Sequence, residues 1–204
     1  VTAMSNCRGA DGNWPQWRGP LGTGVSPDGE PPVEWSEEKN IRWKIALPGK
    51  GHSTPIIWDD RVFITTAMPF GESLTPTYSD QPGAHDEVPI AHRHKFIVMG
   101  VSRHDGKILW ERTVREEFPH AGGHYTASLA SHSLVTDGER LFASFGSYGV
   151  YCLSLDGELL WENDLGKMHT LHGHGEGSSP ALFRDVLIVN WDDEGQSFLV
   201  AIDK

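Results

Sequence analysis

One sequence unit recurs along this chain at a fixed spacing, and it restricts the fold more than any other feature. In residues 98–111 an alternating apolar stretch leads into Asp-Gly, a charged residue, two apolar residues and Trp-Glu, and residues 150–162 repeat that order. Asp105 and Asp156 are 51 residues apart, as are Trp110 and Trp161. A further copy begins in residues 198–204. Repetition at this length indicates an array of equivalent units that bury their apolar faces against one another.

A second pattern precedes each copy and supplies further strands. A serine-led apolar segment, a turn containing Asp and another apolar segment occur in residues 53–65, 133–143 and 178–189. Each predicts two short strands around a tight turn. One repeat is therefore four short strands in about 50 residues, which is the size of a propeller blade. A β-sandwich has strands at this spacing but does not reuse one sequence, so we expect an all-β fold, a β-propeller of four-stranded antiparallel blades.

The eight tryptophans have an architectural explanation in such a fold. A large flat ring on the outer strand of a blade can fill the wedge between that blade and its neighbour. Propellers have four to eight blades, and two and a half blades cannot close a ring. We therefore expect an N-terminal fragment of a seven- or eight-bladed ring whose natural chain is about twice as long.

The repeat also predicts how the chain is divided. Residues 1–40 form a leader and extended segment, and residues 41–204 form the partial propeller. Within the propeller we expect a ring-closing strand at 41–47, blade one at 53–113, blade two at 126–164 and the start of blade three at 177–204. A long insertion, 68–94, separates the second and third strands of blade one. Loops of this length are often functional, and we expect this one to cover one face of the ring and contact a partner.

Composition excludes several classes of function. The formal net charge of −11 argues against a nucleic-acid-binding surface, which needs basic stripes. No apolar run is long enough to span a membrane. Cys7 and Cys152 do not form a metal or redox motif, and they leave open either a bridge between them or a lone buried Cys152.

The Asp-Gly-Lys-x-x-Trp unit at 105–110 is similar to the repeat of quinoprotein alcohol dehydrogenases. The same repeat occurs in the propeller subunit of the outer-membrane barrel-assembly machinery. The leader at 14–26 and the segments at 33–36 and 40–44 resemble, more narrowly, the secreted PQQ-binding-like propeller proteins of planctomycete-type bacteria. This resemblance implies export by a signal peptide to the periplasm or the exterior of a bacterial cell. It also implies a monomeric interaction scaffold with a protein partner in the cell envelope.

The resemblance leaves one alternative function open. It is a PQQ-dependent dehydrogenase, which oxidises an alcohol or a sugar with pyrroloquinoline quinone and Ca²⁺. The resemblance implies that such an enzyme needs a catalytic Asp, a calcium site of Glu, Asn and Asp, and often a pair of adjacent cysteines. No Cys-Cys occurs in these 204 residues, and residues 155–158 depart from the usual Thr-Gly-Lys of the enzymes. We therefore favour a non-enzymatic scaffold, with most of any catalytic site expected beyond Lys204.

The histidines are the clearest candidates for chemistry. Of 11 histidines, one group lies at 120, 124 and 132 and another at 169, 172 and 174. Both groups precede the first strand of a blade, so a propeller would place them on one face, together with His52. Neutral imidazoles are common ligands of zinc and copper, which makes His172, His174 and His124 the candidate metal ligands. The competing interpretation is that these side chains cap strand ends. The acidic pairs at 59–60 and 192–193 are interpreted as turn residues rather than calcium ligands.

Overall fold

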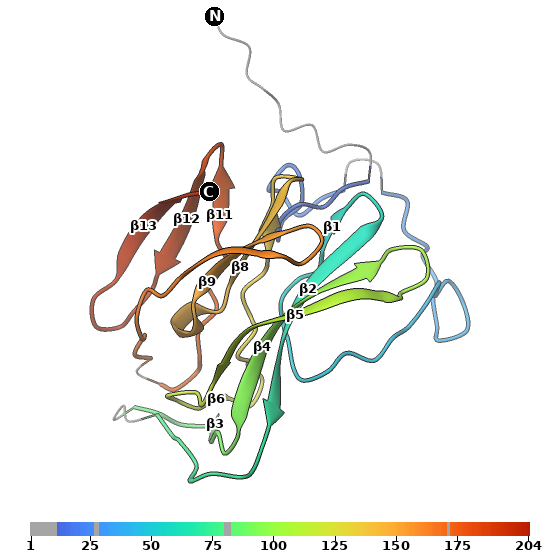
Figure 1. Ribbon diagram of the computed structural model, residues 1–204. Helices are drawn as coiled ribbons and strands as arrows, with labels where there is room; N and C mark the ends of the chain where they lie inside the picture. Colours follow the sequence, from blue (N-terminus) through green and yellow to red (C-terminus); the bar gives the residue numbers. More distant parts are fainter. Residues whose placement is uncertain (1–11, 27–28, 80–82, 171) are drawn as a thin grey trace, which may run out of the picture.

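The protein folds into consecutive antiparallel β-sheets in the computed structural model, which describes residues 12–26, 29–79, 83–170 and 172–204 (Figure 1). The first sheet has the order β1-β2-β4-β5. Its strands are β1 (Ile56–Trp58), β2 (Arg61–Phe70), β4 (Arg93–Ser102) and β5 (Ile108–Glu117). Sequential hairpins join these strands, as expected for a propeller blade.

The second and third sheets repeat this hairpin order. The second sheet contains β7 (Val135–Thr136), β8 (Arg140–Ser144), β9 (Val150–Ser154) and β10 (Leu159–Asn163). The third contains β11 (Ala181–Phe183), β12 (Val186–Trp191) and β13 (Phe198–Asp203). A short 3₁₀ turn, η1 (Gly146–Tyr148), joins β8 to β9. The predicted all-β fold of four-stranded antiparallel blades is confirmed. No helix in the described ranges is long and apolar enough to cross a membrane.

The middle sheet is buried on both faces, which explains its alternating pattern of large apolar residues. Leu141 of β8 and Leu153 of β9 pack toward the first sheet, in a cluster with Phe63 and Phe96. Phe142 and Cys152 point the other way, in a cluster with Leu187 and Val189 of the third sheet. Side chains alternate across a strand, so successive residues serve the two inter-sheet cores. Cys152 is a buried free thiol whose pKa burial raises to about 11; Cys7 lies outside the described residues.

Tryptophan side chains join neighbouring blades by the same contact at two places. The Trp110 indole nitrogen, on β5, donates a hydrogen bond to the carbonyl oxygen of Leu155 at 3.0 Å. Its ring lies against Gly157 in the β9–β10 turn. Trp43 likewise donates to Arg103 at 2.9 Å and covers Gly106 in the β4–β5 turn. Trp110 therefore links blade one to the Asp-Gly turn of blade two, and Trp43 makes the same contact with the Asp-Gly turn of blade one, as the wedge-filling prediction requires.

Residues 41–47 are not assigned to a strand, and their ring-closing role stays a prediction. The contact of Trp43 with the blade-one turn is the contact that a strand of the preceding blade would make. The inserted segment is shorter than predicted, because the β2–β4 ladder continues through Met68–Lys95, Pro69–His94 and Phe70–Arg93.

The structure also corrects the alignment of the serine-led strands by one residue. The strand pairs Ile56–Phe63, Val135–Phe142 and Ala181–Ile188 occupy equivalent positions. Ser133 is thus equivalent to Thr54 and Ser179, and not to Ser53. The backbone N–H of Thr54 donates to the Ser133 hydroxyl at 2.9 Å, and that of Ser133 donates to the Ser179 hydroxyl at 2.9 Å. Blades one and two therefore each use a hydroxyl of the following blade to satisfy a backbone donor just before the inner strand.

Replacing Gly157 by Ala tests the tryptophan contact. Gly157 has φ +86°, and a Cβ there would lie 2.6 Å from the Trp110 ring. Gly71 is the matched control, because it has φ +77° and a Cβ added there would meet no atom within 4 Å. We expect Gly71→Ala to lower the free energy of unfolding by about 1 kcal/mol through backbone strain alone. Gly157→Ala should cost about 2 kcal/mol more because the ring must move. Urea denaturation measures both, and equal losses would contradict a structural role for the contact.

Candidate functional site

One face of the blades is covered by three loops that meet over a cavity. The inserted segment contributes β3 (Glu87–Val88), which pairs antiparallel with β6 (Gly123–His124) from the loop after β5. The two short strands form a separate sheet at the lower end of the first blade in Figure 1. The loop 164–180, between β10 and β11, closes the third side. Loops on a rigid scaffold are the usual place for binding residues.

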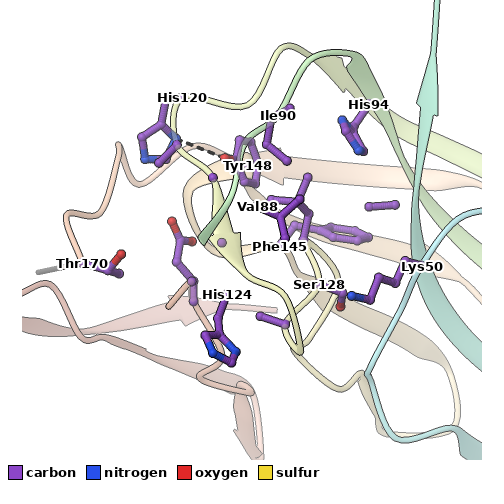
Figure 2. Close-up of a pocket in the computed structure, with 18 of the residues that line it drawn as sticks. Lys50, Val88, Ile90, His94, His120, His124, Ser128, Phe145, Tyr148 and Thr170 are labelled. Carbon is purple, nitrogen blue, oxygen red and sulfur yellow. Dashed lines mark hydrogen bonds between the residues drawn. The ribbon is translucent and has the colours of Figure 1, made fainter. Parts of the chain in front are cut away.

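The cavity between these loops has a volume of ≈ 180 Å³. Its lining is mainly apolar and comes from the insertion, the β5–β7 connection, η1 and the 164–180 loop (Figure 2). The apolar part of the wall includes Val88, Ile90, Leu129, Phe145, Tyr148 and Met168. This volume is below the several hundred Å³ of a typical small-molecule pocket and suits one large side chain or a ring of that size.

A hydrogen-bonded chain fixes the aromatic wall of the cavity. Tyr148 stacks on Phe96 with ring centroids 4.4 Å apart. The Tyr148 hydroxyl and His120 Nδ1 are 3.1 Å apart (Figure 2). His120 Nε2 lies 3.1 Å from the carbonyl oxygen of Met168. Because a carbonyl oxygen can only accept, His120 donates a hydrogen bond from Nε2 to Met168. Its Nδ1 then carries no proton and accepts a hydrogen bond from the Tyr148 hydroxyl. Burial lowers the pKa of His120 and raises that of Tyr148, so both groups stay neutral at pH 7.

A carboxylate holds the 164–180 loop against η1. Glu176 accepts hydrogen bonds from the backbone N–H of Ser147 at 2.7 Å and from its hydroxyl at 2.5 Å. The same hydroxyl accepts the backbone N–H of Met168 at 2.7 Å. Burial raises the pKa of Glu176, while the bonds to Ser147 oppose that rise. One serine therefore anchors both ends of the loop segment that walls the cavity.

His132 is the most unusual polar group in the cavity lining. It is 2% exposed, and neither ring nitrogen has a hydrogen-bond partner among the described residues. Desolvation lowers its pKa from 6.5 to about 4. Nothing in the sequence distinguished it from the neighbouring loop histidines, because its burial depends on the packing of two blades.

The structure brings the three predicted histidines together. The ring centroids of His124 and His174 are 5.2 Å apart, and those of His172 and His174 are 5.6 Å apart. His85, in the insertion, joins them at 5.5 Å from His172 and 4.9 Å from His174. Sequence reasoning missed His85 because it lies about 90 residues away in an insertion outside the repeat. Within the described residues, no group of three or more His, Cys, Asp or Glu side chains is placed so that it could hold a metal ion.

The other predicted candidates have local roles or lie elsewhere. His52 lines a second hollow with Trp17 and the inner-strand serines. Asp59, at φ +50°, forms the β1–β2 turn with Asp60. Asp193 accepts the backbone N–H groups of His169 and Gly195. These contacts agree with the interpretation of the acidic pairs as turn residues.

The blades, their hairpin order and the tryptophan contacts define a β-propeller of PQQ-like repeats. Residues 32–171 match the family described as outer membrane protein assembly factor BamB, and the chain belongs to this family. No curated protein matches the chain. The solved structure of BamB from Moraxella catarrhalis is similar over 79% of this chain and 40% of that chain, with 12% sequence identity and a TM-score of 0.47. The chain thus spans less than half the length of that protein. The narrower resemblance to planctomycete-type proteins stays a prediction.

The buried His132 predicts a dependence of stability on pH. Its pKa is about 4 in the folded protein and 6.5 when unfolded. Between these values the unfolded chain takes up a proton that the folded protein does not, so stability falls as pH drops below 6.5. At pH 4 the folded protein has lost about 3 kcal/mol of unfolding free energy through His132, relative to pH 7. We expect His132→Phe to remove that loss, so that the difference in unfolding free energy between variant and wild type changes from pH 7 to pH 4. Urea denaturation at several pH values measures this difference. If the unfolding free energies of variant and wild type differed by the same amount at every pH, the buried neutral state of His132 would be contradicted.

Proposed function

We propose that this propeller is a binding scaffold for a protein of the bacterial cell envelope, and that it presents the face covered by β3, β6 and the 164–180 loop. The observation that carries the proposal is the apolar cavity of ≈ 180 Å³ on that face. Protein interfaces concentrate their binding energy in a few large side chains that fill such pockets. The proposed occupant of the cavity is therefore a single apolar or aromatic side chain of the partner.

The rim of the cavity supports this proposal. Tyr125 lines the cavity and is 61% exposed, and Tyr78 of the insertion is 57% exposed. Tyrosine is enriched in interfaces because it combines apolar area with a hydrogen-bonding end. Leu74 and Val88 of the insertion add exposed apolar surface. The insertion therefore offers aromatic and apolar contact area around a pocket, which is the composition of a binding surface.

Family membership supports the location of the partner. The family is described as an outer membrane protein assembly factor, and the proposed site of action is accordingly the periplasmic side of the envelope. The chain is proposed to act there as a monomer after export. The alternative drawn from the repeat, a PQQ-dependent dehydrogenase, is favoured by no observation in the described residues.

Site-specific photo-cross-linking tests the binding face. A photoreactive phenylalanine derivative replaces Tyr125 or Tyr78 in the full-length protein, expressed in its own bacterium. The control carries the same probe at Leu160, which is 47% exposed on the outer strand β10. We expect one envelope protein to be linked from both tyrosine positions and not from Leu160, as identified by mass spectrometry. The same adducts from all three positions, or none from the tyrosines, would contradict the proposal.

Filling the cavity tests the proposed anchor. Ala127 lines the cavity, and its Cβ is 3.6 Å from the position of a Cβ on Gly175. A phenyl ring at position 127 would occupy the space meant for the partner's side chain. We expect Ala127→Phe to lower cross-linking from Tyr78 by about tenfold, the loss of one modest anchor. Ala127→Ser keeps the cavity open and is the matched control. Unchanged cross-linking in the Phe variant would show that the partner does not use the cavity.

A further inference from the structure

His94 lies at one end of the cavity and presents a ring nitrogen that the protein does not use. Alternate residues of β4 face the same side of the sheet, so His94 points the same way as Phe96. Phe96 packs on the aromatic wall of the cavity, with ring centroids 4.4 Å from Tyr148 and 5.4 Å from Phe145. His94 is half-buried and lines the cavity, and Figure 2 shows it well apart from His124. The strand therefore carries an imidazole to the end of an apolar wall.

The hydrogen bond of the His94 ring decides which of its nitrogens is free. Nδ1 lies 3.0 Å from the carbonyl oxygen of His92, which can only accept, so Nδ1 carries the proton. Burial is the main influence on the ring and lowers the pKa of His94, so the imidazole is neutral at pH 7. Among the described residues, His92 is the only hydrogen-bond partner of this ring. His94 Nε2 is therefore an unprotonated nitrogen that can accept a hydrogen bond and cannot donate one.

Other polar groups of the lining are satisfied within the protein or closed off. His120 uses both ring nitrogens, and each carboxylate oxygen of Glu176 accepts a hydrogen bond from Ser147. The ring nitrogens of His132 are buried without a partner among the described residues, and solvent does not reach them. His94 Nε2 is not closed off in this way, so a group in the cavity has access to it. The cavity thus combines an apolar wall with an open acceptor at its end.

The volume of the cavity limits the bound group to a single six-membered ring. A cavity of about 150 Å³ lined by apolar side chains binds one benzene molecule. The ≈ 180 Å³ of this cavity leaves room for about one further non-hydrogen atom. A phenol ring meets this limit, whereas the fused double ring of an indole exceeds it. The size therefore favours a substituted phenyl ring over a tryptophan side chain.

We propose that the group bound in the cavity is a tyrosine side chain of the partner, with its ring on Tyr148 and Phe145 and its hydroxyl donating to His94 Nε2. The inference rests on the proposed function and names the side chain that anchors the partner. A phenylalanine would cover Nε2 without offering a donor, and a buried acceptor left unpaired costs free energy. A carboxylate cannot donate, and a lysine would have to shed its water among apolar side chains. Tyrosine combines the required ring with the required donor.

Three small probes test the anchor without the partner. 4-Methylphenol, toluene and 3-methylindole carry the side-chain groups of tyrosine, phenylalanine and tryptophan, and each is titrated into the full-length protein by calorimetry. We expect one 4-methylphenol per chain, bound about tenfold more tightly than toluene, because toluene leaves His94 Nε2 unpaired. 3-Methylindole should bind more weakly than 4-methylphenol because of its size. Equal affinities for 4-methylphenol and toluene, a preference for 3-methylindole, or no binding of 4-methylphenol would overturn the proposal.

Substitutions assign the preference to His94 and to the cavity. His94→Phe keeps a ring at this position but removes the acceptor, so the phenol hydroxyl becomes the unpaired group and toluene should bind more tightly than 4-methylphenol. His85→Phe makes the same change outside the cavity lining and should keep the preference for 4-methylphenol. Ala127→Phe fills the cavity and should remove the binding of both probes. A preference for 4-methylphenol that survives in His94→Phe, or binding that survives in Ala127→Phe, would overturn the proposal.

The probe titrations and the cross-linking experiment distinguish failure of the tyrosine anchor from failure of the proposed function. A partner cross-linked from Tyr125 and Tyr78, with no preference of the cavity for 4-methylphenol, would leave the binding face standing and overturn the tyrosine anchor. A cavity that prefers 4-methylphenol without any cross-linked partner would contradict the proposed function, and with it the partner as the source of the phenol.

Discussion

The contact of a tryptophan ring with a glycine turn is the interaction on which the blade array depends. Trp43 covers Gly106 and Trp110 covers Gly157, and each indole also donates a hydrogen bond to a carbonyl of the turn that it covers. The contact requires glycine twice over, because the turn needs positive φ and the ring needs the space of the missing side chain. It ties each of these turns to the segment that precedes it, and the two apolar clusters fill the space between the consecutive sheets.

The parts of the fold that could be predicted are those in which local chemistry recurs. The Asp-Gly turns and alternating strands satisfy the same local rules in each copy, so the sequence repeats wherever the structure does. Prediction was weaker where the structure depends on packing between blades. The shift of one residue at Ser133 became visible only in the registers of the strand pairs and in the hydrogen bond that Ser133 accepts from Thr54 of the previous blade. His85 could not be connected with His172 from the sequence, because only the folded insertion brings them together.

The candidate site lies where the chain departs from its repeat. The β3–β6 sheet comes from an insertion in blade one and from the connection between blades one and two. The insertion has no counterpart in the other blades of the described residues. The blades hold these two segments in place, because the strands from which they leave are fixed. Those strands are fixed by their pairing, by the serine hydrogen bonds between blades and by the tryptophan contacts. Glu176 and Ser147 then hold the remaining loop against the second blade. Binding surfaces built in this way can vary between relatives without disturbing the cores below.

His132 shows the same departure within a blade. It occupies the inner-strand position that is Ser53 in blade one and Ser178 in blade three. Ser53 exchanges hydrogen bonds with the backbone of Thr65, so a serine satisfies this position at little cost. At this position neither nitrogen of the His132 imidazole has a hydrogen-bond partner among the described residues, and burial removes the ring from water. A blade built for stability alone would keep the serine, because an unpartnered buried polar group costs about 1–3 kcal/mol. The exception stands next to the cavity, as expected if the wall of the cavity is shaped for binding at the expense of stability.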